Sequence, residues 1–163
     1  MMNLKEENLV INQRLVFFLI SILLLVSFCS IFFIENHSLV AHDESLYANR
    51  AKLIINSNNW FTPFETAHHK TIGSYWLIAL SFKIFGISEF SARLPSYIFS
   101  ILSSFVLFKI IKDISSVGIG LISIFTLSSS FIWFSYSRYC SPDTLYIFLN
   151  LLGILFLLKT TVL

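Results

Sequence analysis

The sequence LVFFLISILLLVSFCSIFFI occupies residues 15–34, and this run of twenty uncharged residues indicates the class of fold. A helix rises about 1.5 Å per residue, so such a run crosses the roughly 30 Å hydrocarbon core of a bilayer. Lys5 and Arg14 precede the run as they would in a signal peptide, but the run is longer than a typical signal core. Phe28 stands before Cys29, where a lipoprotein cleavage site needs a small residue. We therefore expect an uncleaved transmembrane helix over 15–34.

The composition of the whole chain supports the same class. Hydrophobic residues make up 56% of the 163 residues and charged residues 12%, whereas soluble domains carry about 25% charged residues. The net charge of +2 comes without a basic block, which argues against a nucleic-acid partner. We expect an all-α integral membrane protein in contact with a lipid bilayer.

Three further apolar runs predict transmembrane helices over 92–111, 117–134 and 144–158. Together with 15–34 they give about four spans in a single membrane domain, 1–163. With the N-terminus inside, the segments 35–91 and 135–143 lie outside. The positive-inside bias is weak, because most of the exceptions fall in the long outer segment, where the rule counts for less.

The outer segment 35–91 also contains helical patterns. Residues 45–55 alternate apolar and polar groups in the way of a short amphipathic helix on a membrane surface. Residues 75–85 are apolar but too few to cross a bilayer, and Gly86 ends them. We expect an interfacial helix over the first stretch and an interfacial or re-entrant helix over the second, with Trp60 as an aromatic anchor between them.

Charged residues gather on this outer face, and they are the candidates for chemistry. An ionised carboxylate such as Asp43 can act as a base. A cationic pair such as Lys70 and Arg138 can hold phosphate. Together these groups suit transfer of a group from a phosphate-linked donor to a hydroxyl or amine. A donor with a polyprenyl tail would explain a site at the bilayer edge.

Each of these groups also has a plain structural explanation. Asp43 and Glu44 can cap a helix. His69 and its histidine neighbour are more often exposed loop residues than ligands, and no third metal ligand is evident. Arg138 and Asp143 can form an ion pair at the membrane boundary. No metal is assigned, although a divalent ion stays open.

The aromatic residues and the cysteines have simple interpretations as well. The aromatic residues that flank the apolar runs are interpreted as interfacial belts; they are Trp60, Tyr75, Trp76, Trp133, Tyr136 and Tyr139. Cys29 and Cys140 are interpreted as small core residues.

Five short motifs, taken in order, resemble a known family. They are Asp43-Glu44-Ser-Leu-Tyr47-Ala48, Trp60-Phe-Thr-Pro63, Tyr75-Trp76 through Gly86, Ser88-Glu89-Phe-Ser-Ala-Arg93-Leu94-Pro95-Ser96, and Ser137-Arg138 with Ser141-Pro142-Asp143. In order and spacing, over residues 15–160, they resemble the N-terminal region of the GT-C membrane glycosyltransferases of the protein O-mannosyltransferase and aminoarabinose transferase type. That resemblance implies a hexosyl or pentosyl transferase that uses a polyprenyl-phosphate sugar on the periplasmic or exterior face of a membrane, here a bacterial inner membrane.

The resemblance also implies roles for single residues. Asp43 would be the catalytic base and Glu44 a supporting carboxylate. Asp143 would be a second acid of the pocket, and Lys70 a phosphate contact. Tyr47, as part of the first motif, joins the substrate-binding candidates.

The chain departs from the family pattern in two places. His69 stands where many members carry an acidic residue, which puts a metal site there in doubt and marks a possible difference in substrate, although His69 remains a substrate-binding candidate. Members of the family also have many more spans, so the chain is expected to need a separately encoded or missing C-terminal remainder. The alternative to an enzyme is a non-catalytic membrane subunit or a truncated inactive paralogue.

Overall fold

A computed structural model describes residues 18, 38–39, 43–61, 63–64 and 72–162 of the chain. The predicted span over 15–34 lies, apart from Phe18, outside the described residues, and so do His69 and Lys70. The described part contains helices and connecting segments and no strand, so the prediction of an all-α fold is confirmed. The helices are α2 (Asp43–Ser57), α3 (Gly73–Phe85), α4 (Glu89–Ile114), α5 (Val117–Ser129), α6 (Phe131–Tyr136) and α7 (Asp143–Val162).

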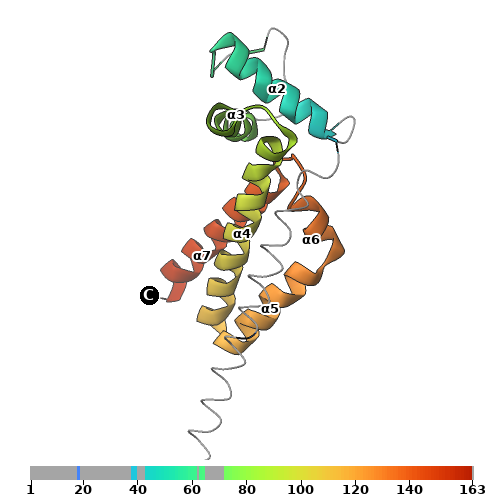
Figure 1. Ribbon diagram of the computed structural model, residues 1–163. Helices are drawn as coiled ribbons and strands as arrows, with labels where there is room; N and C mark the ends of the chain where they lie inside the picture. The colour runs from blue at the N-terminus through green and yellow to red at the C-terminus, as the bar shows by residue number, and fades with distance from the viewer. Residues whose placement is uncertain (1–17, 19–37, 40–42, 62, 65–71, 163) are drawn as a thin grey trace, which may run out of the picture.

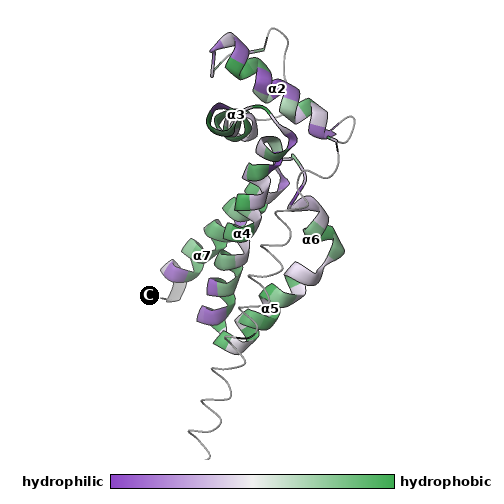
Figure 2. Cartoon of the chain, viewed as in Figure 1, coloured by the Kyte–Doolittle hydropathy of each residue, from purple (hydrophilic) through white to green (hydrophobic). Residues whose placement is uncertain are grey.

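The helices form two layers (Figure 1). α4, α5 and α7 run side by side, whereas α2 and α3 lie across one end of α4. Both helices predicted within residues 35–91 are therefore present. α4 and α7 are long and apolar enough to cross a membrane, and α3 and α5 are shorter apolar helices. Hydrophilic residues gather on α2, whereas hydrophobic residues follow α4, α5 and α7 (Figure 2).

α4 begins three residues before the apolar run that predicted it, because Ser88 caps it. The Ser88 hydroxyl accepts a hydrogen bond from the Ser91 amide at 3.1 Å, and the Ser91 hydroxyl accepts one from the Ser88 amide at 2.9 Å. This reciprocal capping box satisfies amides that the helix leaves unpaired. Pro95 consequently lies in the second turn of the helix and not in its first turn.

The segment predicted as one helix over 117–134 is two helices. α5 ends at Ser129, Ser130 is extended with ψ 126°, and α6 restarts at Phe131. Three consecutive serines occupy this point, and the Ser129 hydroxyl donates to the carbonyl of Thr126 at 3.0 Å. Serine side chains that bond the local backbone compete with the helix. The break redirects the chain toward the turn between α6 and α7.

α5 packs closely on α4 through a glycine. A Cβ added at Gly120 would lie 2.9 Å from a ring carbon of Phe108 and 3.3 Å from the Phe108 carbonyl oxygen. Only a residue without a side chain permits this approach.

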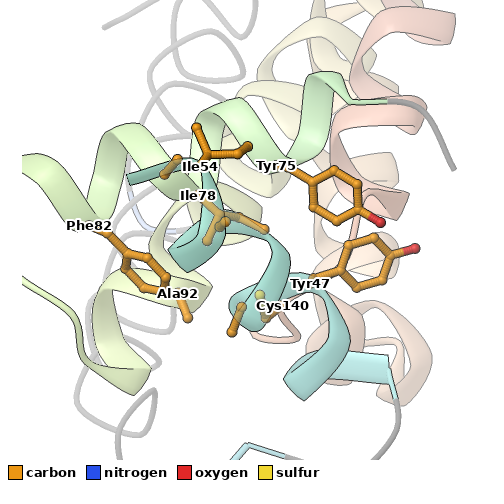
Figure 3. Packing of buried hydrophobic residues seen from close by; sticks show 10 residues of the cluster. Tyr47, Ile54, Tyr75, Ile78, Phe82, Ala92 and Cys140 are labelled. Carbon is orange, nitrogen blue, oxygen red and sulfur yellow. The ribbon is translucent and has the colours of Figure 1, made fainter. Parts of the chain in front are cut away.

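The buried core lies at the end of the bundle where α2 and α3 cross α4 (Figure 3). Ala51, Ile54, Tyr75 and Ala79 are fully buried there, and the rings of Tyr47 and Tyr75 lie 5.5 Å apart, centroid to centroid. Along α5 and α7, by contrast, large apolar side chains are exposed, such as Ile122 and Phe156. This distribution fits helices surrounded by lipid, with a packed head at one end.

Candidate active site

Glu44 and Arg93 form a buried ion pair that joins α2 to α4. The Arg93 Nε and Nη2 atoms each donate to one carboxylate oxygen of Glu44 at 2.8 Å. The side chains of Arg93 and Glu44 are 6% and 1% exposed. Such a two-point pair fixes the orientation of both groups as well as their charge. Glu44 is thus held inside the protein, and its carboxylate is already occupied.

The same carboxylate reaches the turn between α6 and α7. The backbone amide of Cys140 donates to Glu44 Oε1 at 2.7 Å, and Arg93 Nη2 also donates to the carbonyl of Ser38 at 3.3 Å. Glu44 therefore connects three parts of the chain that are far apart in sequence. Cys140 is a buried free thiol; burial, with a smaller contribution from Glu44, raises its pKa to about 12. A thiol with that pKa is not a nucleophile at neutral pH.

A second link fixes the same turn to α4. The hydroxyl of Ser96 donates to the carbonyl of Ser141 at 3.0 Å, and the Ser141 amide donates back to that hydroxyl at 3.4 Å. Both serines are buried. The turn is therefore held from α2 and from α4 at once, which gives the residues around it a defined position.

A cavity of about 400 Å³ opens beside this turn. Its lining residues come from the start of α2, from the end of α6 and the turn after it, and from the start of α7; they are Asp43, Tyr47, Ser135, Tyr136, Tyr139, Ser141, Pro142 and Asp143. Small-molecule sites span roughly 300–1,000 Å³. Two predicted site carboxylates, Asp43 and Asp143, thus face one cavity, and both are exposed.

The neighbours Asp43 and Glu44 consequently differ in burial: Asp43 is exposed and Glu44 is buried. Successive residues of a helix point about 100° apart, so the first turn of α2 directs Glu44 into the core and Asp43 to the cavity. The two carboxylates begin α2, where the helix dipole favours negative charge. The sequence paired them as catalytic candidates, and the structure separates a buried anchor from an accessible acid.

Tyr139 and Tyr136 line the cavity, although the sequence pattern indicated membrane belts for both. Their ring centroids lie 6.0 Å apart. Burial raises the pKa of the Tyr139 hydroxyl, and the charges of Glu44 and Asp43 raise it further. Tyr139 therefore remains a neutral hydroxyl beside the acid. Their position in the predicted outer turn next to Asp143 was the only sequence signal for this role.

Arg138 lies in the same turn but does not line the cavity. Its guanidinium stacks on the ring of Phe134, 3.7 Å from the centroid, and its Nε donates to the Phe134 carbonyl at 3.2 Å. Burial lowers the pKa of Arg138, and the charge of Arg93 lowers it further. Among the described residues Arg138 has no carboxylate partner, so the ion pair with Asp143 considered from the sequence is not formed.

The structure thus brings together Asp43, Tyr47 and Asp143, with Arg138 in the adjoining turn. The described ranges hold no group of three or more His, Cys, Asp or Glu residues that could bind a metal ion. Arg93 was missed as a site residue. An arginine at the start of an apolar helix is costly unless it is paired, and that cost was the signal that it has a carboxylate partner.

Comparison with known proteins identifies the family. A family model described as dolichyl-phosphate-mannose-protein mannosyltransferase matches residues 69–162. The chain belongs to this family. The resemblance found in the sequence is therefore confirmed, and family membership together with the apolar helices α4 and α7 identifies a membrane protein. The match begins after Asp43 and Glu44, so it covers the α6–α7 turn but not the start of α2.

One curated relative is similar over much of the chain. An uncharacterized protein of Aquifex aeolicus (strain VF5) is 31% identical over 110 residues, which are 65% of this chain and 22% of the relative. The chain thus spans about a fifth of the length of that relative. No solved structure gives a significant match.

Proposed function

We propose that this chain forms the acceptor-activating part of a glycosyltransferase that moves a sugar from a polyprenyl-phosphate donor to a protein, lipid or glycan acceptor. The observation that carries the proposal is the contrast between Asp43 and Glu44. The Asp43 carboxylate faces a cavity of ligand size. The Glu44 carboxylate is paired with Arg93 and holds the turn that forms part of the cavity wall. Membership of the mannosyltransferase family supplies the class of reaction.

Asp43 acts as the base in this proposal. It takes the proton from the acceptor hydroxyl or amine while the acceptor atom bonds to the anomeric carbon. The bond between that carbon and the phosphate oxygen breaks, and its electron pair leaves with the polyprenyl phosphate. Glu44 is already neutralised by Arg93, so it does not compete for the proton. Asp143, on the same cavity, holds substrate hydroxyls.

The departing phosphate needs positive charge, and Arg138 can supply it. Among the described residues, Arg138 contacts Phe134 through Nε and through stacking on the ring, and its terminal nitrogens have no hydrogen-bond partner. An anion beside Arg138 would also relieve its unfavourable proximity to Arg93. Lys70, which lies outside the described residues, is proposed as the second phosphate contact.

The lipid tail of the donor accounts for the location of the site. The cavity lies at the end of the bundle where α7 begins, next to the head formed by α2 and α3 (Figure 1). A polyprenyl chain could remain in the bilayer along the apolar helices while its phosphate reaches that end. We place this end at the periplasmic or exterior face of a bacterial inner membrane.

The test is transfer of radiolabelled mannose from polyprenyl-phosphate mannose in membranes with and without the chain. Asp43→Asn removes the base and should lower the transfer rate by about 10²–10⁴-fold. Asp113→Asn is the matched control, because Asp113 is an exposed carboxylate near the far end of α4; its rate should stay within twofold. Near-parent transfer by Asp43→Asn would refute the base. That result would favour the non-catalytic subunit.

A further inference from the structure

We propose that Tyr136 and Tyr139 form a platform on which a neutral pyranose ring packs, with Asp43, Asp143 and Ser141 holding its hydroxyls. This inference rests on the proposed function, because it takes the occupant of the cavity to be a sugar. It goes further by naming the residues that recognise the sugar and the charge class that they admit.

The two tyrosines differ from an interfacial belt in what they face. Tyr136 is 48% exposed, and both rings line a cavity that also carries two carboxylates. Their planes are inclined by 52° at a centroid distance of 6.0 Å, so they form a concave corner. A belt would face lipid headgroups and would need no acidic partners.

Ser141 supplies an independent sign that the cavity is a ligand site. The residue is 8% exposed and lines the cavity. Its backbone amide and carbonyl are both bonded to Ser96, which fixes the residue. Its own Oγ is buried and has no hydrogen-bond partner in the part of the chain that the structure describes. A buried hydroxyl without a partner is unfavourable and uncommon in native proteins, and a ligand hydroxyl in the cavity would satisfy it.

The chemistry of the lining matches a pyranose. One face of such a ring presents C–H groups, and their partly positive hydrogens pack on the partly negative face of an aromatic ring. The hydroxyls around the ring donate to carboxylates and to the serine oxygen. A few polar groups around an aromatic wall are the usual composition of a small-molecule site.

The charge of the lining selects among sugars. Among the described residues, the cavity lining has two acidic side chains, Asp43 and Asp143, and no lysine or arginine. An anionic sugar such as a uronic acid would meet like charge there. The phosphate of a donor would therefore lie outside the cavity, toward the turn that carries Arg138, while the uncharged ring enters.

Saturation-transfer NMR on the full chain tests the platform directly. The chain is placed in phosphatidylcholine nanodiscs, because glycoside detergents would compete, and methyl α-mannopyranoside is the probe. We expect transfer to its ring C–H protons, at least tenfold weaker binding for Tyr139→Leu and Tyr136→Leu, and parent-like binding for Tyr139→Phe. Methyl glucuronide should bind at least tenfold more weakly than the mannoside.

Tyr146→Leu is the matched control, because Tyr146 is an exposed tyrosine on α7 outside the cavity lining; its binding should equal that of the parent. Absence of mannoside binding by the parent would overturn the platform. Parent-like binding by both Tyr136→Leu and Tyr139→Leu would do so as well. Equal binding of the glucuronide would overturn the charge selection.

The two proposals can fail separately. If the mannoside binds through the tyrosines but Asp43→Asn leaves sugar transfer intact, the base is wrong and the platform stands. If sugar transfer needs Asp43 but both Tyr136→Leu and Tyr139→Leu bind the mannoside like the parent, only the platform is wrong.

Discussion

Replacement of Glu44 by glutamine should loosen the head of the molecule without any loss of side-chain volume. The change leaves Arg93 charged and buried opposite an amide, whose NH₂ group cannot accept from Nη2. Removal of one partner of a buried pair typically costs about 3–5 kcal/mol. The side chains of Arg93 and Glu44 are 6% and 1% exposed, so water does little to offset that cost. The glutamine oxygen can still accept a hydrogen bond from the Cys140 amide, so we expect a cost near the lower end of the 3–5 kcal/mol range.

Cys140 offers a direct measurement of this effect, because its thiol is buried and its amide bonds to Glu44. The rate of thiol labelling at pH 8 follows the opening of the turn. A cost of 3–5 kcal/mol corresponds to about 10²-fold to 4 × 10³-fold faster labelling, at 1.4 kcal/mol for each factor of ten. A Cys29→Ser background leaves Cys140 as the reporter.

Two companion variants complete the experiment. Asp43→Asn makes the same carboxylate-to-amide change at the adjacent, exposed residue. The labelling rate of Cys140 in this variant should stay within threefold of the parent. Glu44→Leu combined with Arg93→Met removes both charges and should recover most of the protection. The reasoning is refuted if Glu44→Gln labels within threefold of the parent.

Two further predictions concern packing and pH. Gly120→Ala should destabilise the α4–α5 contact by about 1–3 kcal/mol in detergent unfolding, because its Cβ would meet Phe108 at 2.9 Å. Gly118→Ala is the control: Gly118 has open space around it, so this change should stabilise the protein by up to about 1 kcal/mol. Equal effects of the two substitutions would contradict the close approach at Gly120. Stability should fall as pH rises from 9 to 12, since the folded pKa of Cys140 is raised from 9.0 to about 12 and only the unfolded thiol ionises in that window. Cys140→Ala should flatten this decline in pH-dependent unfolding, and an unchanged slope would contradict it.

The fold class was predictable because the bilayer imposes it. Few charges and long apolar runs leave helices as the main solution for a chain of this composition. The break at Ser130 was not foreseen, since a serine is tolerated in a helix. Three consecutive serines stand where α5 ends, and the Ser129 hydroxyl there bonds the Thr126 carbonyl. The early start of α4 at Glu89 depends on the capping geometry of Ser88, which apolar periodicity does not report.

The site was predictable in part. Topology placed Asp43 and Asp143 on one face, and they line one cavity. Topology could not show that Glu44 is buried while Asp43 faces the cavity. That difference depends on the direction in which the first turn of α2 meets Arg93. The places of Tyr136 and Tyr139 in the cavity were hidden for a related reason, although Tyr47 was a candidate. A tyrosine at a membrane boundary has the same sequence pattern whether it faces lipid or a ligand.

The contacts of Glu44 have a consequence for the order of biosynthesis. Its partners Arg93 and the Cys140 amide follow it by 49 and 96 residues. At roughly 5–20 residues per second, a ribosome needs about 5–20 s to deliver the second of them. The carboxylate therefore gains these two partners only after the intervening segments have been synthesised. The cavity beside Asp43 is completed only at the arrival of the turn before α7, so a slow step in translation or insertion there delays the completion of that cavity.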